Sequence, residues 1–199
     1  MAFEVIMKKL VVIDACIRQD QSRTWSIAEP IVDALVKRYE ISIYHLPMME
    51  DIVPLNPGTF WERGNGETPQ WAIDCARTIA EADRILIAAP FWDMSFPAVL
   101  KAFFEQTSLY NITFADNGKE CVGLCKCEKV LYITTRGMDI QTGDPLEQAT
   151  PYLKALSALW GLGEVICVSA QKMDYVDESE MKARIDKAIK EGLEIAETF

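Results

Sequence analysis

Five short apolar stretches, separated by longer segments of helical periodicity, constrain the fold of this chain more than any other feature of its sequence. The stretches span residues 9–14, 41–45, 84–89, 129–134 and 164–169. Apolar runs of this length, rich in valine and isoleucine, are typical of buried β-strands. Strands that alternate with helices form a parallel sheet with helices on both of its faces. The sequence therefore predicts an α/β fold with a five-stranded parallel sheet.

The segments between these strands carry the signals of the covering helices. The expected helices span residues 24–39, 69–82, 97–104, 146–160 and 178–197. Pro97 suits a helix start because proline is favoured in the first helical turn. Asn117-Gly118 indicates a hairpin. No linker or repeat divides the chain, so we expect residues 1–199 to form one domain, with a Pro- and Gly-rich excursion over residues 47–66 whose role is open.

Composition and charge exclude several classes of function. Among 199 residues, 30 are acidic and 20 are basic, which gives a net charge of −10 at pH 7. A surface of that sign repels phosphate, so we expect neither nucleic acid nor a membrane as a main partner. No apolar stretch is long enough to span a bilayer, and the first residues lack the order of a secretory signal. We therefore expect a cytoplasmic protein.

The six cysteines are expected to be free thiols, as is usual inside cells. Cys121, Cys125 and Cys127 lie close together in sequence, but their C-x3-C-x-C spacing differs from that of common zinc sites and no fourth ligand is near. The sequence therefore predicts no metal site. An iron–sulfur centre at this cluster is the alternative.

The candidate site is formed by the loops after the first, third and fourth strands, because ligands of open parallel sheets bind beyond the carboxyl ends of the strands. The first loop supplies Arg18 and Ser22, and Arg23 and Thr24 follow at the helix start. Guanidinium groups, hydroxyls and the free N–H groups of a helix start together favour a phosphate. The competing interpretation is that Ser22 only caps the helix and that the arginines face solvent.

The loop after the third strand is aromatic. It contains Pro90, Phe91, Trp92, Asp93 and Met94. Large apolar side chains are unfavourable in water, and a flat apolar ligand would bury them. The competing interpretation is that they pack under a neighbouring loop or a partner subunit.

The loop after the fourth strand contains Thr135, Arg136, Gly137 and Met138. Gly137 permits close approach of the backbone to a ligand, and Arg136 would favour negative charge there. The competing interpretation is a simple turn in which Arg136 pairs with an acidic surface neighbour. The motifs of a dinucleotide site (G-x-G-x-x-G) and of a phosphate-loop hydrolase are absent from the sequence.

Residues 89–101, Ala-Pro-Phe-Trp-Asp-Met-Ser-Phe-Pro-Ala-Val-Leu-Lys, resemble the P-[MLI]-[YW]-N-x-x-[IV]-P-x-x-L-K segment of the flavodoxin-like NAD(P)H oxidoreductases. That family includes FMN-dependent azoreductases and quinone reductases. Residues 111–118, 135–137 and 150–153 follow in the family's order. The resemblance implies a three-layer flavodoxin-like fold with strand order 2-1-3-4-5. It further implies bound FMN, and hydride transfer from NADH or NADPH through FMN to a quinone, azo or nitro compound, in a homodimer with FMN at the subunit interface.

Carried over to this sequence, the resemblance implies that Arg18, Ser22 and Thr24 contact the FMN phosphate. It implies that residues 91–94 border the isoalloxazine ring and that residues 135–137 approach the pyrimidine edge of that ring. No catalytic acid or base is expected, because the flavin itself carries the chemistry.

Tyr110 and Phe114 are expected to line the pocket of a small-molecule electron acceptor, across the dimer. Three residues depart from the family pattern: Ala15 replaces a serine, Asp93 the usual asparagine and Met138 a second glycine. Their effect on flavin binding stays open, as do the physiological acceptor and the choice between NADH and NADPH.

Two other functions fit the same expected fold. A flavodoxin-like electron carrier would pass electrons to protein partners, and an acidic surface suits basic ones. A binding module of this fold would have lost the cofactor, which the three departures from the family pattern allow.

Overall fold

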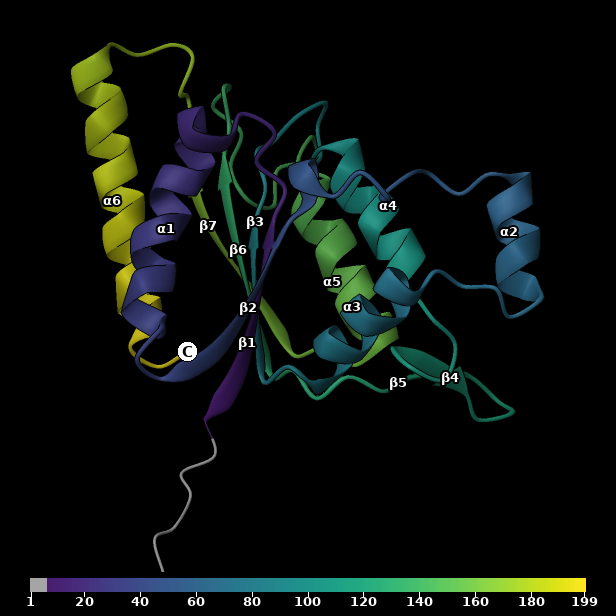
Figure 1. Cartoon of the computed structure of the whole chain (residues 1–199). Coiled ribbons are helices and arrows are strands. Elements are labelled where there is room, and N and C mark those ends of the chain that lie inside the picture. The colour runs from purple at the N-terminus through teal and green to yellow at the C-terminus, as the bar shows by residue number, and fades with distance from the viewer. Residues whose placement is uncertain (1–6) are drawn as a thin grey trace, which may run out of the picture.

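The computed structural model describes residues 7–199. Its central sheet is parallel and has the strand order β2-β1-β3-β6-β7 (Figure 1). The strands are β1 (Lys8–Asp14), β2 (Tyr39–His45), β3 (Arg84–Ala88), β6 (Lys129–Thr135) and β7 (Glu164–Ala170). Since β6 and β7 are the fourth and fifth strands of this sheet, the predicted order 2-1-3-4-5 is confirmed.

Helices cover both faces of the sheet, as expected (Figure 1). On one face lie α1 (Arg23–Leu35) and α6 (Glu178–Ala196), and on the other α3 (Gln70–Glu81), α4 (Ala98–Thr107) and α5 (Ala149–Trp160). A buried apolar cluster fills each side. The two helices of the first face approach closely at Gly192, where a Cβ would lie 2.2 Å from Cδ1 of Ile31. The three layers predicted from the sequence are therefore present.

Two helices are shorter than their periodicity suggests. The first was expected to reach residue 39 but ends at Leu35, because Tyr39 is buried as the first residue of β2 and pairs there with Lys8. The helix expected over residues 146–160, α5, starts at Ala149 rather than at residue 146. Glu147 precedes it in a turn, where its Oε1 accepts a hydrogen bond from the backbone N–H of Thr150 at 2.8 Å.

The antiparallel hairpin at Asn117-Gly118 is confirmed, and it joins β4 (Phe114–Asp116) to β5 (Cys121–Gly123). This hairpin lies at the lower right in Figure 1, near the amino ends of the sheet strands. Two short 3-10 turns, η1 (Gln19–Gln21) and η2 (Leu46–Met48), follow β1 and β2. Within the described part of the chain, no helix is both long and apolar enough to cross a membrane.

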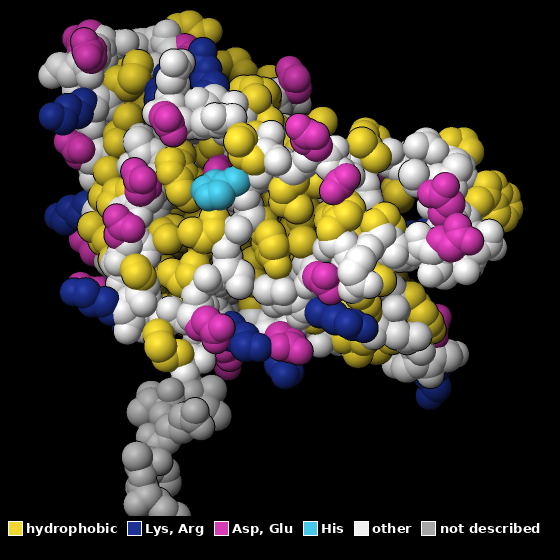
Figure 2. Space-filling model, in the orientation of Figure 1, with side chains coloured by type: hydrophobic (Ala, Val, Ile, Leu, Met, Phe, Trp, Pro, Cys, Tyr) yellow, Lys and Arg dark blue, Asp and Glu magenta, His cyan; other side chains and the backbone are white. Residues whose placement is uncertain are grey.

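The excursion over residues 47–66 contains a helix that was not predicted from the sequence, α2 (Pro57–Gly64). It starts at a capping box in which Asn56 and Thr59 exchange hydrogen bonds. The helix projects from the body at the right of Figure 1, and hydrophobic side chains lie at its tip in Figure 2. Within this helix, Phe60 and Trp61 are 61% and 68% exposed.

Candidate ligand-binding site

A pocket of about 90 Å³ lies at the carboxyl edge of the sheet, and all three predicted loops line it. Its lining residues are Arg18, Ser22, Arg23, Thr24, Pro90, Phe91, Trp92, Thr135, Gly137 and Asp174. Sites for whole small ligands usually measure about 300–1,000 Å³. The enclosed part therefore suits one end of a ligand, and the remainder would lie over the open edge beside Trp92, which is 42% exposed.

The first loop presents hydroxyls and an unpaired cation. Ser22 is the N-cap of α1, and its Oγ accepts a hydrogen bond from the backbone N–H of Trp25 at 3.2 Å. Capping uses that oxygen as an acceptor, so its O–H is still free to donate to a ligand. Arg18 is exposed, and its guanidinium forms no hydrogen bond or ion pair with any residue from 7 to 199. The loop can thus offer a guanidinium, a hydroxyl and a helix start to an anion.

Thr24 joins the first loop to the third. It is fully buried, and its Oγ1 lies 2.7 Å from Oγ1 of Thr135. Ala15, just after β1, is also buried, and its N–H donates to the carbonyl of Ala88 at 2.8 Å. These contacts fix the spacing of the loops around the pocket.

A fourth loop, after β7, closes the pocket and was not part of the sequence prediction. Nη2 of Arg23 lies 2.7 Å from Oδ1 of Asp174, and Nη1 donates to the carbonyl of Met173 at 2.9 Å. Gly137 leaves room for this arrangement, because a Cβ there would lie 2.0 Å from Oδ2 of Asp174 and the Asp174 side chain would have to move. Since β7 also ends at the carboxyl edge, the topological rule used for the other loops could have included this one.

The second loop turns sharply beside the pocket. The N–H of Phe91 donates to the carbonyl of Thr135 at 3.1 Å, which extends the pairing of β3 with β6. Trp92 and Ser95 then exchange two backbone hydrogen bonds of 2.9 Å around Asp93 and Met94. Both central residues have positive φ, 48° and 66°, as in a type I′ turn. Neither of them lines the pocket.

Replacing Asp93 with glycine is expected to raise the free energy of unfolding of the ligand-free protein by about 0.5 kcal/mol, and replacing it with alanine to lower it by about 0.5–1 kcal/mol. Glycine adopts positive φ without steric cost, whereas alanine lacks the polar side chain that lets aspartate tolerate it. Urea unfolding of the three proteins measures the order of stability. If the alanine variant were more stable than the glycine variant, the result would contradict a left-handed backbone conformation at residue 93.

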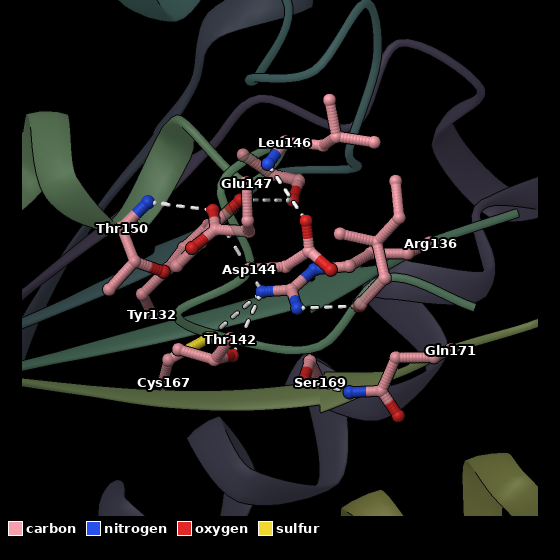
Figure 3. A network of polar contacts seen from close by, with 12 residues as sticks. Tyr132, Arg136, Thr142, Asp144, Leu146, Glu147, Thr150, Cys167, Ser169 and Gln171 are labelled. Carbon is pink, nitrogen blue, oxygen red and sulfur yellow. Dashed lines mark hydrogen bonds and ion pairs between the residues drawn. The ribbon is translucent and has the colours of Figure 1, made fainter. Parts of the chain in front are cut away.

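Arg136, in the third loop, does not point into the pocket. Its side chain is fully buried, and Nη2 lies 3.9 Å from Oε1 of Glu147, which is also fully buried (Figure 3). Arg136 is therefore paired with an acidic residue, as the competing interpretation held, but in the interior rather than at the surface. Met138 is 39% exposed and likewise lies outside the pocket lining.

Tyr110 and Phe114 lie outside the pocket within one chain. They follow the far end of α4, whose first turn begins just after the second loop, and their ring centres are 6.0 Å apart. A ten-residue helix is about 15 Å long, so the two rings and the pocket are at opposite ends of this element.

The cysteine cluster has no features of a metal centre. Cys121 is exposed, and burial raises the pKa of Cys125 to about 12 and that of Cys127 to about 11. Both groups are therefore protonated thiols near neutral pH. From residue 7 to the C-terminus, no three histidine, cysteine or acidic residues are grouped in a way that could hold a metal ion.

A larger groove, of about 660 Å³, runs between α6 and the edge strand β7. Charged side chains of α6 line it, and Arg184 among them pairs with Glu180 and donates to the carbonyl of Gln171. No aromatic residue is part of this lining. The smaller pocket, with Phe91 and Trp92, is the better candidate for a flat ligand.

Comparison with known proteins defines the class of this molecule. A family model described as flavodoxin-like fold matches residues 8–194. The chain therefore belongs to the flavodoxin-like fold family, and the resemblance seen in its sequence is confirmed.

Among curated relatives, the chain is 30% identical over 206 residues to an FMN-dependent NADH:quinone oxidoreductase of Caldicellulosiruptor saccharolyticus, and the alignment covers 97% of this chain and 100% of that protein. It is 34% identical over 126 residues to FMN-dependent NADH:quinone oxidoreductase 2 of Clostridium acetobutylicum, where the alignment spans 62% of each chain. A crystal structure of an azoreductase from Bacillus anthracis superposes with a TM-score of 0.80 at 18% identity, covering 97% of this chain and 100% of that one.

Proposed function

We propose that this protein is an FMN-dependent NADH:quinone oxidoreductase that also accepts azo or nitro compounds. The observation that carries the proposal is the convergence of the three predicted loops on one pocket at the carboxyl edge of the sheet. The printed names of curated relatives that align over nearly the whole chain support it.

The residues of the pocket fit FMN. A phosphate would be held by Arg18, Ser22, Thr24 and the N–H groups at the start of α1, where Arg18 has no competing partner among residues 7–199. The ring would lie along Phe91 and the exposed face of Trp92, since a flat apolar group covers that surface.

When bound, FMN supplies the hydride and electron chemistry, so the protein needs to bind and orient it rather than act as an acid or base. Gly137 leaves the turn after β6 without a side chain at the pocket, so backbone N–H groups can approach the ring edge. The ion pair between Arg23 and Asp174 connects the loop after β7 to the start of α1 across the pocket. Of the two arginines that line the pocket, Arg23 is therefore already paired. Both donor and acceptor would reach the ring from the open side beside Trp92.

We further propose that the protein acts as a cytoplasmic homodimer. The exposed rings of Phe60 and Trp61 on α2 and of Tyr110, which is 56% exposed, support a second subunit that covers them. A partner's Tyr110 and Phe114 could then border the acceptor. The six free cysteines agree with a reducing compartment. Light scattering after gel filtration tests the dimer, and a monomeric mass would exclude it.

NADH oxidation by the FMN-loaded protein in the presence of a soluble quinone tests the proposed function. The rate is expected to depend on both FMN and the quinone. If bound FMN is not reduced by NADH or NADPH, the electron-carrier alternative is favoured. If the purified protein is colourless and takes up no FMN, the cofactor-free binding module is favoured.

A further inference from the structure

A buried ion pair lies directly behind the ligand pocket. Arg136 follows β6 and Glu147 precedes α5; both side chains are 0% exposed, and the shortest distance between their charged atoms is 3.9 Å. Figure 3 shows the two side chains turned toward each other between the ribbon of the sheet and the start of α5. Ions are kept in such a place only where hydrogen bonds compensate for the lost water.

The partners of this pair come from several segments. Nη1 of Arg136 donates to the carbonyl of Ile140 at 2.9 Å, and Nη2 donates to Oγ1 of Thr142 at 3.0 Å. Glu147 uses Oε1 to accept from the backbone N–H of Thr150 at 2.8 Å. One polar atom of each side chain, Nε of Arg136 and Oε2 of Glu147, has no partner in the described residues. The hydrogen bonds thus fix the guanidinium in one orientation without satisfying it completely.

The same arginine is joined to the pocket through its neighbours. Its guanidinium carbon lies 5.5 Å from the centre of the Phe91 ring, and Phe91 lines the pocket. Its backbone N–H donates to the carbonyl of Ala170 at 2.8 Å, and its carbonyl accepts from the N–H of Met173 at 3.0 Å. Thr135 and Gly137, on either side in sequence, also line the pocket. Arg136 therefore connects the second, third and fourth loops without lining the pocket itself.

We propose that Arg136 is a positioning residue for the ligand: held by Glu147, it fixes Phe91 and the turn at residues 135–137 from the interior. The inference rests on the proposed function, in which that ligand is FMN. It assigns to Arg136 a role different from the direct contact expected from the sequence. Lysine cannot replace it, because a single ammonium lacks the planar fork that reaches Ile140 and Thr142 and packs on an aromatic ring.

Two variants and one matched control test this proposal. Arg136→Lys keeps the charge and loses the fork, whereas the double variant Arg136→Met with Glu147→Gln removes both charges and leaves neither ion buried alone. The control is Lys190→Met, which breaks an ion pair of the same 3.9 Å distance to Glu194 at a site where the two side chains are 80% and 65% exposed.

The first measurement is amide hydrogen exchange of the ligand-free proteins. The amides of Phe91 and Asp174 report on the pocket, because they donate to Thr135 and Gly137 at 3.1 Å each. Both variants at Arg136 are expected to speed exchange of these amides about 10-fold relative to amides in β6, and the control is expected to change neither. The second measurement is the dissociation constant for FMN well below the unfolding temperature, expected to rise about 10-fold in both variants.

The outcomes separate this inference from the proposed function. If thermal stability falls in Arg136→Lys while local exchange and FMN affinity stay as in the wild type, Arg136 is merely structural and the proposal is overturned. If the wild-type protein binds no FMN, the proposed function fails, and hydrogen exchange in the ligand-free proteins alone decides whether Arg136 fixes the loops. If the double variant does not fold, hydrogen exchange and FMN affinity of Arg136→Lys alone test the proposal.

Discussion

Replacing Arg18 with alanine is expected to raise the dissociation constant for FMN about 10- to 100-fold. Arg18 lines the pocket beside the start of α1, and its guanidinium has no hydrogen-bond or ion-pair partner among residues 7–199, so its charge is free to meet a phosphate. A hydrogen bond between a guanidinium and a phosphate contributes about 1.5–3 kcal/mol, which corresponds to this range of affinity.

Arg77→Ala is the matched control for this prediction. Arg77 is an exposed arginine on α3 and lies outside the pocket lining. Its loss removes the same charge from an acidic protein, so any general electrostatic effect on FMN appears in both variants. Fluorescence titration of FMN gives the three affinities. Equal affinity of wild type and Arg18→Ala would mean that Arg18 faces solvent in the complex.

Replacing Trp160 with alanine is expected to lower the free energy of unfolding by about 3–5 kcal/mol, the largest stability effect that we expect in this chain. Trp160 is 1% exposed at the end of α5. Its ring meets that of Phe104 edge-on with 5.8 Å between centres, and its indole N–H donates to Oγ of Ser108 at 3.1 Å. Truncation leaves a cavity and an unpaired hydroxyl together.

Tyr175→Ala serves as the comparison, because Tyr175 is 68% exposed in the segment between β7 and α6 and lies outside the proposed subunit interface. Its free energy of unfolding is expected to stay within about 0.5 kcal/mol of the wild type. Denaturant unfolding at one fixed protein concentration measures the free energy of unfolding of both variants and of the wild type. Similar losses for the two variants would show that the core between α4 and α5 is packed differently from the structure described above.

The strands and their order were predictable because burial on both faces leaves a direct record in the sequence. The core strands at 84–88 and 129–135 are buried almost throughout and apolar at their centres, and a parallel sheet admits few connections. The pocket residues of the first two loops were predictable for a related reason, because the loops that follow parallel strands all lie at the carboxyl edge of the sheet. Their role in binding FMN is still a prediction.

Other features depend on contacts between distant segments and leave no local pattern. From its sequence, Arg136 resembles a surface residue in a turn. In the structure it is buried, where it pairs with Glu147, eleven residues later in the chain. Asp174 reaches the pocket because Gly137 leaves space for it. The helix α2 is half polar and shows no face that packs on the core, so its capping box was its main sequence signal.

A crystal structure of the protein soaked with FMN tests most directly whether the loops at the carboxyl edge form a cofactor site. We expect the phosphate within hydrogen-bond distance of Ser22 and Thr24 and beside Arg18, and the ring against Phe91 and Trp92. Density for FMN in the groove between α6 and β7, or clear density for an empty pocket at saturating FMN, would contradict this account.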